Sequence, residues 1–189
     1  MTKRIVAAFD FDGTITTRDT LLPFLKQYGL WKLTKGTCKT LGGIQRGNLR
    51  NALKENTLKA LFADFPVERL EEEGRIYAET LPRFYRKETL GRIKFHKERG
   101  DQLVLVTGSL GCYARPAAAA LGFDHTFAVE LASTLGHMTG DIQGANVRGP
   151  EKARLLKNHL KGEPVELWAY GNSSGDKEML KMADHAKMV

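Results

Sequence analysis

Hydrophobic and polar residues follow two patterns along the chain. Short apolar runs at residues 4–11 and 102–109 end in small polar or turn-forming residues, which predicts buried strands. Between them, from about residue 19 to residue 90, apolar residues recur every three or four positions, which predicts helices. After that block the two patterns alternate. Strands are expected at 125–131, 165–173 and 186–189, a short hairpin at 136–147, and helices at 89–101, 111–123, 150–162 and 175–184.

This order of elements predicts an α/β fold with a Rossmann-like parallel sheet core and helices on both faces. Parallel strands need helical crossovers, and these cover both sides of the sheet. The helical block comes directly after the first strand, so residues 16–90 are interpreted as an inserted all-helical cap. The core is then formed by residues 1–15 and 91–189. Ligands of such folds bind beyond the carboxyl ends of the strands.

Composition limits the class of protein. With 189 residues, 42% hydrophobic and 27% charged, the chain fits one globular domain or a domain with a modest insertion. No apolar stretch approaches the roughly 18–20 residues of a membrane span, and the first apolar run, broken by Asp10, is too short for a signal peptide. Cys38 and Cys112 form no spaced pattern, which favours a reducing, cytoplasmic environment over a disulfide scaffold.

The net charge of +7 is concentrated in one window. Residues 26–59 contain eight Lys and Arg residues and one acid, Glu55, so that this window alone carries +7. It is interpreted either as a solvated helical face or as a surface that attracts an anionic substrate or an anionic membrane. No motif of nucleic-acid-binding proteins accompanies it, so no nucleic-acid partner is expected.

Two aspartates end the first predicted strand. Residues i and i+2 of a strand project to one face, so Asp10 and Asp12 are expected side by side. Their repulsion must be offset by a shared cation or by a raised pKa on one of them. A hard divalent ion such as Mg²⁺ suits such oxygen ligands. The alternative is an aspartate that caps the next helix, but one acid would suffice for that.

Polar residues also stand at the other strand ends. Thr107 can donate a hydrogen bond to a phosphate oxygen, and the N–H groups of Gly108 and Ser109 can open a helix N-terminus toward an anion, unless Ser109 is an ordinary N-cap. Lys152 falls in the first turn of a helix, where the dipole mildly disfavours it, although a solvated lysine is the simpler interpretation. Asn172 and Asp176 are oxygen donors that suit Mg²⁺.

The stretches "DFDGT", "VTGS", "GPEK" and "YGNSSGDKEML" occur in the order and spacing of the four motifs of the haloacid dehalogenase superfamily. The chain resembles that family over nearly its whole length. Within the family, "TGDIQGANVRGPEKARLL" and "GNSSGDKEML" resemble the phosphoserine phosphatase-like branch, subfamily IB, and the inserted helices look like its first type of cap (C1).

The resemblance implies a phosphatase mechanism. Asp10 would be the nucleophile that forms an aspartyl-phosphate, and Asp12 would protonate the leaving group and then activate water. Lys152 would neutralise charge on the phosphoryl group. The phosphate would be held by Thr107, Gly108 and Ser109, and Gly13 would leave room for it. The implied ligands of Mg²⁺ are Asp10, the backbone carbonyl of Asp12, Asn172 and Asp176.

Three positions bear on the substrate. Asn172 stands where the family usually has an aspartate, which lowers the charge around the metal. Gly175 stands where phosphoserine phosphatases often carry an asparagine, so one phosphate or substrate contact is missing. Asp19 falls where those enzymes place an acid that faces the substrate amine, and it can equally cap the helix that starts at Thr20.

The leading hypothesis is a Mg²⁺-dependent phosphatase that hydrolyses a phosphate monoester. Its substrate is either a small soluble ester or a lipid phosphate of the phosphatidylglycerophosphate type, since the basic, partly apolar segment fits peripheral contact with an anionic membrane. The competing hypothesis is a catalytically weak phosphate-binding or regulatory module. The oligomeric state stays open at this stage.

Overall fold

The computed structural model describes residues 3–29, 46–161 and 164–189. The strands are β1 (Arg4–Phe9), β2 (Phe65–Pro66), β3 (Gln102–Leu110), β4 (His125–Val129), β5 (Leu131–Thr134), β6 (His137–Ile142), β7 (Val165–Gly171) and β8 (His185–Met188). The helices are α1 (Leu21–Lys26), α3 (Arg46–Phe62), α4 (Val67–Glu79), α5 (Lys87–Arg99), α6 (Gly111–Leu121), α7 (Pro150–His159) and α8 (Lys177–Lys181), with a 3₁₀ turn at Leu81–Phe84.

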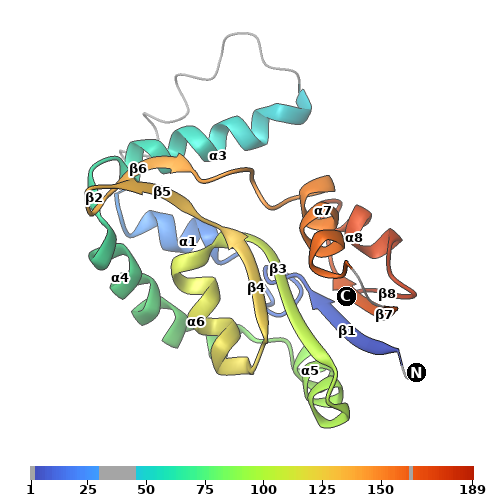
Figure 1. Ribbon diagram of the computed structural model, residues 1–189. Coiled ribbons are helices and arrows are strands. Elements are labelled where there is room, and N and C mark those ends of the chain that lie inside the picture. The colour runs from blue at the N-terminus through green and yellow to red at the C-terminus, as the bar shows by residue number, and fades with distance from the viewer. Residues whose placement is uncertain (1–2, 30–45, 162–163) are drawn as a thin grey trace.

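Five strands form one parallel sheet in the order β4-β3-β1-β7-β8. The central strand β1 is completely buried from Val6 to Phe9, as expected for a strand covered on both faces. Figure 1 shows α4 and α6 on one side of the sheet and α7 and α8 on the other. The predicted α/β fold, a parallel sheet flanked by helices, is therefore confirmed.

A smaller antiparallel sheet has the order β2-β6-β5. The expected hairpin exists, but it spans β5 and β6 rather than residues 136–147. Its two-residue turn consists of Leu135 and Gly136, which have φ values of 48° and 80°. The strand β2 lies within residues 16–90, so this stretch is not entirely helical.

The helix α3 lies across the top of the molecule beside β6, above the carboxyl-terminal ends of the parallel strands (Figure 1). Much of the basic window, including Lys32, Lys35 and Lys39, lies outside the described residues. So do Cys38 and Gly162, the expected end of the helix α7, which ends at His159 instead. None of the described helices is long and apolar enough to cross a lipid bilayer.

Candidate active site

A cavity of about 630 Å³ lies at the carboxyl ends of β1, β3 and β7. Its polar side consists of residues at these strand ends, and its apolar side consists of leucines from α1 and α3. The sequence-predicted site residues that line it are Asp10, Asp12, Gly13, Asp19, Thr107, Gly108, Lys152 and Asn172. The remaining two, Ser109 and Asp176, are buried behind the lining and contact it through Asp12 and Lys152. The fold thus gathers all ten predicted residues in one place.

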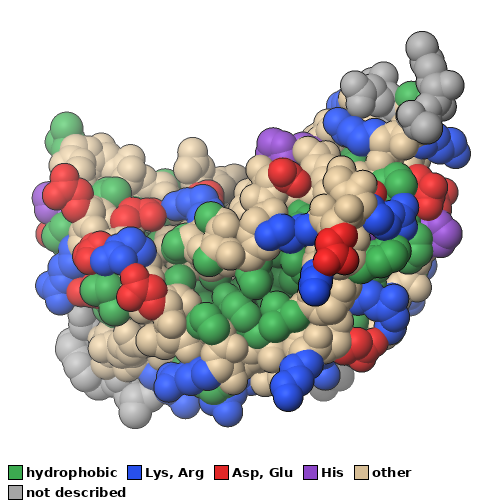
Figure 2. Space-filling view, turned by 90° about the horizontal axis from the view of Figure 1, so that it is seen from below, with side chains coloured by type: hydrophobic (Ala, Val, Ile, Leu, Met, Phe, Trp, Pro, Cys, Tyr) green, Lys and Arg blue, Asp and Glu red, His purple; other side chains and the backbone are tan. Residues whose placement is uncertain are grey.

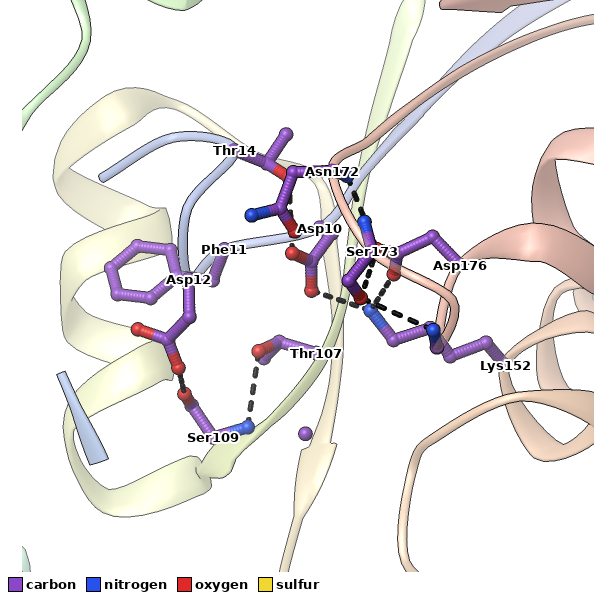
Figure 3. A network of polar contacts seen from close by, with 12 residues as sticks. Asp10, Phe11, Asp12, Thr14, Thr107, Ser109, Lys152, Asn172, Ser173 and Asp176 are labelled. Carbon is purple, nitrogen blue, oxygen red and sulfur yellow. Dashed lines mark hydrogen bonds and ion pairs between the residues drawn. The ribbon is translucent and has the colours of Figure 1, made fainter. Parts of the chain in front are cut away.

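Lys152 lies between two carboxylates, as Figure 3 shows. Its Nζ is 2.5 Å from Oδ1 of Asp10 and 2.7 Å from Oδ1 of Asp176. The second oxygen of Asp10 accepts a hydrogen bond of 3.0 Å from the hydroxyl of Thr14. Lys152 is only 3% exposed, so the interpretation as a solvated lysine is wrong.

The charges of this group depend on one another. Burial acts to lower the pKa of Lys152, but the two carboxylates outweigh it and hold that pKa above its ordinary value. Burial acts to raise the pKa of Asp176, but Lys152 and hydrogen bonds from Ser173 hold it below its ordinary value. Burial raises the pKa of Asp10, and Lys152 opposes this rise. Lys152 is therefore the cation that keeps this buried pair of carboxylates compatible.

Asp12 does not share the environment of Asp10. Because β1 ends at Phe9, the two acids lie in the loop after the strand, and the expectation of two carboxylates on one face of a strand is wrong. Oδ1 of Asp12 accepts hydrogen bonds from the backbone N–H and the hydroxyl of Thr20, and Oδ2 accepts one from the hydroxyl of Ser109. Burial nevertheless raises the pKa of Asp12 to about 6.

The strand β3 is longer than expected. It runs to Leu110, and α6 begins at Gly111, so Ser109 is not an N-cap and no helix opens at Gly108. The pairing of β3 with β4 shifts register between Val106 and Leu110. In this irregular stretch, the N–H of Ser109 donates to the Thr107 hydroxyl at 3.0 Å. The hydroxyl proton of Thr107 has no acceptor among the described residues and can serve a ligand.

Gly13 lies against the side chain of Asn172. Gly13 has a φ of 78°, and a Cβ atom there would lie 1.9 Å from Nδ2 of Asn172. The glycine therefore leaves room for the asparagine amide. Asp19 lines the cavity and also accepts a hydrogen bond of 2.8 Å from the N–H of Leu22, so it caps α1 from the cavity wall.

The atoms around Asp10 that could bind a metal ion are oxygens of carboxylates, of an amide and of the backbone. Among the described residues, no group of three or more His, Cys, Asp and Glu side chains could hold a metal ion. Mg²⁺ does not need such a group, because it keeps waters and substrate oxygens in its shell and takes one or two carboxylates. The residues present fit Mg²⁺, with the amide of Asn172 in place of a third acid.

Comparison with known proteins gives the family. The family of haloacid dehalogenase-like hydrolases matches residues 7–181. The chain belongs to this family. In this hydrolase, the family match covers every residue of the site described above.

Relatives of this hydrolase include Protein CicA of Caulobacter vibrioides, which is 33% identical over 190 residues, covering 95% of this chain and 83% of CicA. The phosphoserine phosphatase of Methanocaldococcus jannaschii is 27% identical over 185 residues, covering 96% and 83%. Two phosphoserine phosphatase structures, a substrate-bound complex and a phospho-aspartyl intermediate analogue, each superpose with a TM-score of 0.68 at 24% identity. They cover 97% and 96% of this chain, and it covers 84% of each solved chain.

These comparisons confirm three expectations. The chain is a haloacid dehalogenase-like hydrolase, it is similar to phosphoserine phosphatases, and it has their fold. The expected enzyme class, a hydrolase related to phosphatases, is confirmed with them.

Sequence reasoning missed several residues of this hydrolase's site. Nζ of Lys54, on α3, donates to the carbonyl of Gly108 at 2.5 Å and to Oδ1 of Asn146 at 2.7 Å. Arg86 donates to the carbonyl of Gly13 at 3.1 Å. Arg148 lines the cavity beside Gly175. Lys54 and Arg86 stand in no motif, and Lys54 was only one of eight charges in the basic window. Arg148 stands directly before "GPEK", but the sequence alone predicted no role for it.

Proposed function

We propose that this hydrolase is a Mg²⁺-dependent phosphatase that cleaves a phosphate monoester through an aspartyl-phosphate on Asp10. The observation that carries the proposal is the position of Asp10, a carboxylate that is 6% exposed, lies at the cavity wall and has one oxygen on Lys152. A lysine in this position favours the ionised, nucleophilic carboxylate over the neutral acid. A solved relative in the form of a phospho-aspartyl intermediate analogue supports the same chemistry.

In the first step an Oδ atom of Asp10 forms a bond to phosphorus, and the bond from phosphorus to the leaving-group oxygen breaks. Asp12 gives its proton to that oxygen, which is possible near neutral pH because its pKa is about 6. Water then attacks phosphorus, Asp12 takes a proton from it, and Asp10 and orthophosphate are released. The hydroxyl of Thr107 and the N–H of Gly108 hold phosphoryl oxygens, and Lys152 balances their charge.

Mg²⁺ would be held by Asp10, the backbone carbonyl of Asp12, Asn172 and Asp176. When bound, it supplies positive charge that offsets the negative charge of the phosphoryl group. Asp176 also keeps Lys152 in place, since one oxygen contacts the lysine and the other accepts three hydrogen bonds from Asn172 and Ser173. We also propose that residues 16–90 form a cap over a core made of the rest of the chain, and that the protein is cytoplasmic.

The substrate is proposed to be a small phosphate ester, as for the phosphoserine phosphatase relatives. A lipid phosphate is the second candidate, because four leucines line the cavity opposite the aspartates: Leu21, Leu22, Leu25 and Leu53. Leu22 is 50% exposed and continues this apolar wall toward solvent. On the face in Figure 2, Lys and Arg side chains are scattered among acidic ones around a central hydrophobic area, so this face favours no nucleic-acid partner.

The test is phosphate release from p-nitrophenyl phosphate, phosphoserine, sugar phosphates and phosphatidylglycerophosphate, each with Mg²⁺ and with EDTA. We expect Mg²⁺-dependent turnover that falls by at least about 10³-fold in Asp10→Asn, since nucleophile loss removes the covalent route. Asp141→Asn, far along β6 and exposed, serves as the matched control and should retain activity. Absence of turnover by folded protein on every ester would favour the phosphate-binding module instead.

A further inference from the structure

Arg148 lines the cavity, and no carboxylate of the described residues balances its charge. The other cavity arginine, Arg18, lies over the ring of Phe84. Most of the described arginines that form hydrogen bonds to side chains pair with carboxylates, as Arg75, Arg115 and Arg154 do. Arg148 forms no ion pair with a carboxylate among the described residues. Its one side-chain hydrogen bond runs from Nη2 to the hydroxyl of Ser174 at 3.2 Å. A guanidinium has five N–H donors, so several remain for a ligand.

The backbone around Arg148 lies close to the end of β3 on one side and is hydrogen-bonded to the loop after β7 on the other. The carbonyl of Val147 lies 3.4 Å from where a Cβ on Gly108 would be. On the other side, the N–H of Gly149 donates to the carbonyl of Gly175 at 2.8 Å. Arg148 therefore lies between the end of β3, where Thr107 lies, and the loop after β7, which holds Asp176.

The guanidinium also occupies a defined space. A Cβ on Gly175 would lie 3.0 Å from Nη1 and 3.1 Å from Cζ of Arg148, so the glycine lets the arginine lie close against this loop. Arg148, Gly175 and Lys152 all line the cavity that contains Asp10. The fold thus presents a planar cation, with unused donors, to the same space as the proposed nucleophile.

We propose that Arg148 is a substrate-binding residue that donates hydrogen bonds to an anionic oxygen of the phosphate ester. The fork of a guanidinium matches two oxygens of a phosphate or carboxylate, which a lysine cannot do. The oxygen belongs either to the reacting phosphoryl group or to a second anionic group on the leaving group. This inference rests on the proposed phosphatase function.

The experiment compares Arg148→Gln with Arg148→Lys and with the control Arg154→Gln, which removes an exposed arginine of α7. Kinetics are measured on p-nitrophenyl phosphate and on propane-1,3-diol bisphosphate, with Mg²⁺ titrated for each variant. We expect Arg148→Gln to lower kcat/KM by about 10- to 100-fold, mainly through KM, with a partial loss in Arg148→Lys and none in Arg154→Gln. A lower kcat/KM on both esters identifies the reacting phosphoryl group as the partner of Arg148. A lower kcat/KM on the bisphosphate alone identifies a second anionic group as its partner.

Two results would overturn the inference. One is a kcat/KM for Arg148→Gln within twofold of that for Arg154→Gln on both esters. The other is a change confined to the Mg²⁺ concentration for half-maximal rate, because that would mean Arg148 only supports the loop that contains Ser174. If the wild type hydrolyses no ester, the proposed function fails separately. Calorimetric titration with orthophosphate and Mg²⁺ then tests Arg148, with weaker binding expected in Arg148→Gln and equal binding counting against it.

Discussion

At the scale of single residues, the site separates two aspartates that are only two positions apart in sequence. Asp10 contacts Lys152, whereas Asp12 contacts Thr20 and Ser109. Acid–base chemistry with a nucleophile needs this separation, because one carboxylate must stay ionised while the other holds a proton near neutral pH. The sequence identified both acids, but the loop after β1, rather than the geometry of a strand, gives them different neighbours.

The environment of Asp12 predicts a pH-dependent cost to stability. Its pKa is about 6 in the folded protein against an ordinary value of 3.8, so the folded protein binds the proton more tightly than the unfolded chain. The resulting stability is fully present below pH 3.8 and is lost as pH rises through about 6. Asp12→Asn carries no charge and should be more stable than wild type by about 2–3 kcal/mol at pH 8 in EDTA.

Urea unfolding at a series of pH values measures this difference, which should shrink as pH falls toward 4. A difference that is independent of pH would show that Asp12 is not desolvated in the metal-free protein. Activity should be lost in Asp12→Asn at every pH, so the variant trades function for stability.

Gly13 offers a second residue-scale prediction. Gly13 and Gly136 have nearly equal φ values of 78° and 80°, but only at Gly13 would a new Cβ collide with Asn172. Gly136→Ala should cost only the strain of a left-handed alanine, about 1 kcal/mol. Gly13→Ala should cost more and should also raise the Mg²⁺ concentration for half-maximal activity, since Asn172 must move. Equal losses of unfolding free energy and unchanged Mg²⁺ dependence would contradict the role given to this contact.

At the scale of elements, periodicity predicted the type of nearly every helix and strand but not their edges. The run 102–109 predicts a strand that ends at Ser109, but β3 continues to Leu110, and its pairing with β4 shifts register between Val106 and Leu110. The turn of the β5–β6 hairpin was missed because Leu135 adopts a positive φ that glycine, asparagine or aspartate usually takes. Strand ends and turn conformations of this kind depend on tertiary contacts, and the local sequence does not indicate them.

His96 on α5 illustrates a contact between elements that periodicity does not reveal. It is completely buried, with Nδ1 2.7 Å from a carboxylate oxygen of Asp101 and Nε2 2.9 Å from the hydroxyl of Tyr170 on β7. Burial lowers the pKa of His96 and outweighs Asp101, which acts to raise it. The imidazole therefore stays neutral in the folded protein.

The lowered pKa of His96 makes the stability of the folded protein depend on pH. A lowered folded pKa contributes stability that is present above the ordinary value of 6.5 and is lost as pH falls below it. His96→Gln should be less stable than wild type at pH 7.5 by about 1–3 kcal/mol, because buried partners lose hydrogen bonds. The gap should narrow at pH 5.5, as followed by urea unfolding. A gap that widens on acidification would mean that His96 is charged in the folded protein.

At the scale of the whole molecule, the site depends on segments that are far apart in sequence. Its four motifs could be read from the sequence. Three of them stand at the ends of β1, β3 and β7, which meet at one edge of the parallel sheet, and "GPEK" stands at the start of α7. The apolar wall opposite the motifs, formed by leucines of α1 and α3, could not be read from the sequence. These helices carry no motif, and their position beside the sheet depends on tertiary packing. Lys54 is one residue that joins the two halves, since it reaches from α3 to the carbonyl of Gly108 on β3.

This contact predicts that Lys54 holds α3 over the cavity. Lys54→Gln loses charge-assisted hydrogen bonds to Gly108 and Asn146, so KM for p-nitrophenyl phosphate should rise by about tenfold and the amides of α3 should exchange hydrogen faster. Lys59→Gln is the matched control, because Lys59 lies one and a half turns further along α3 in an exposed pair with Asp141. An exchange rate in Lys54→Gln equal to that in Lys59→Gln would show that α3 stays in place without this lysine.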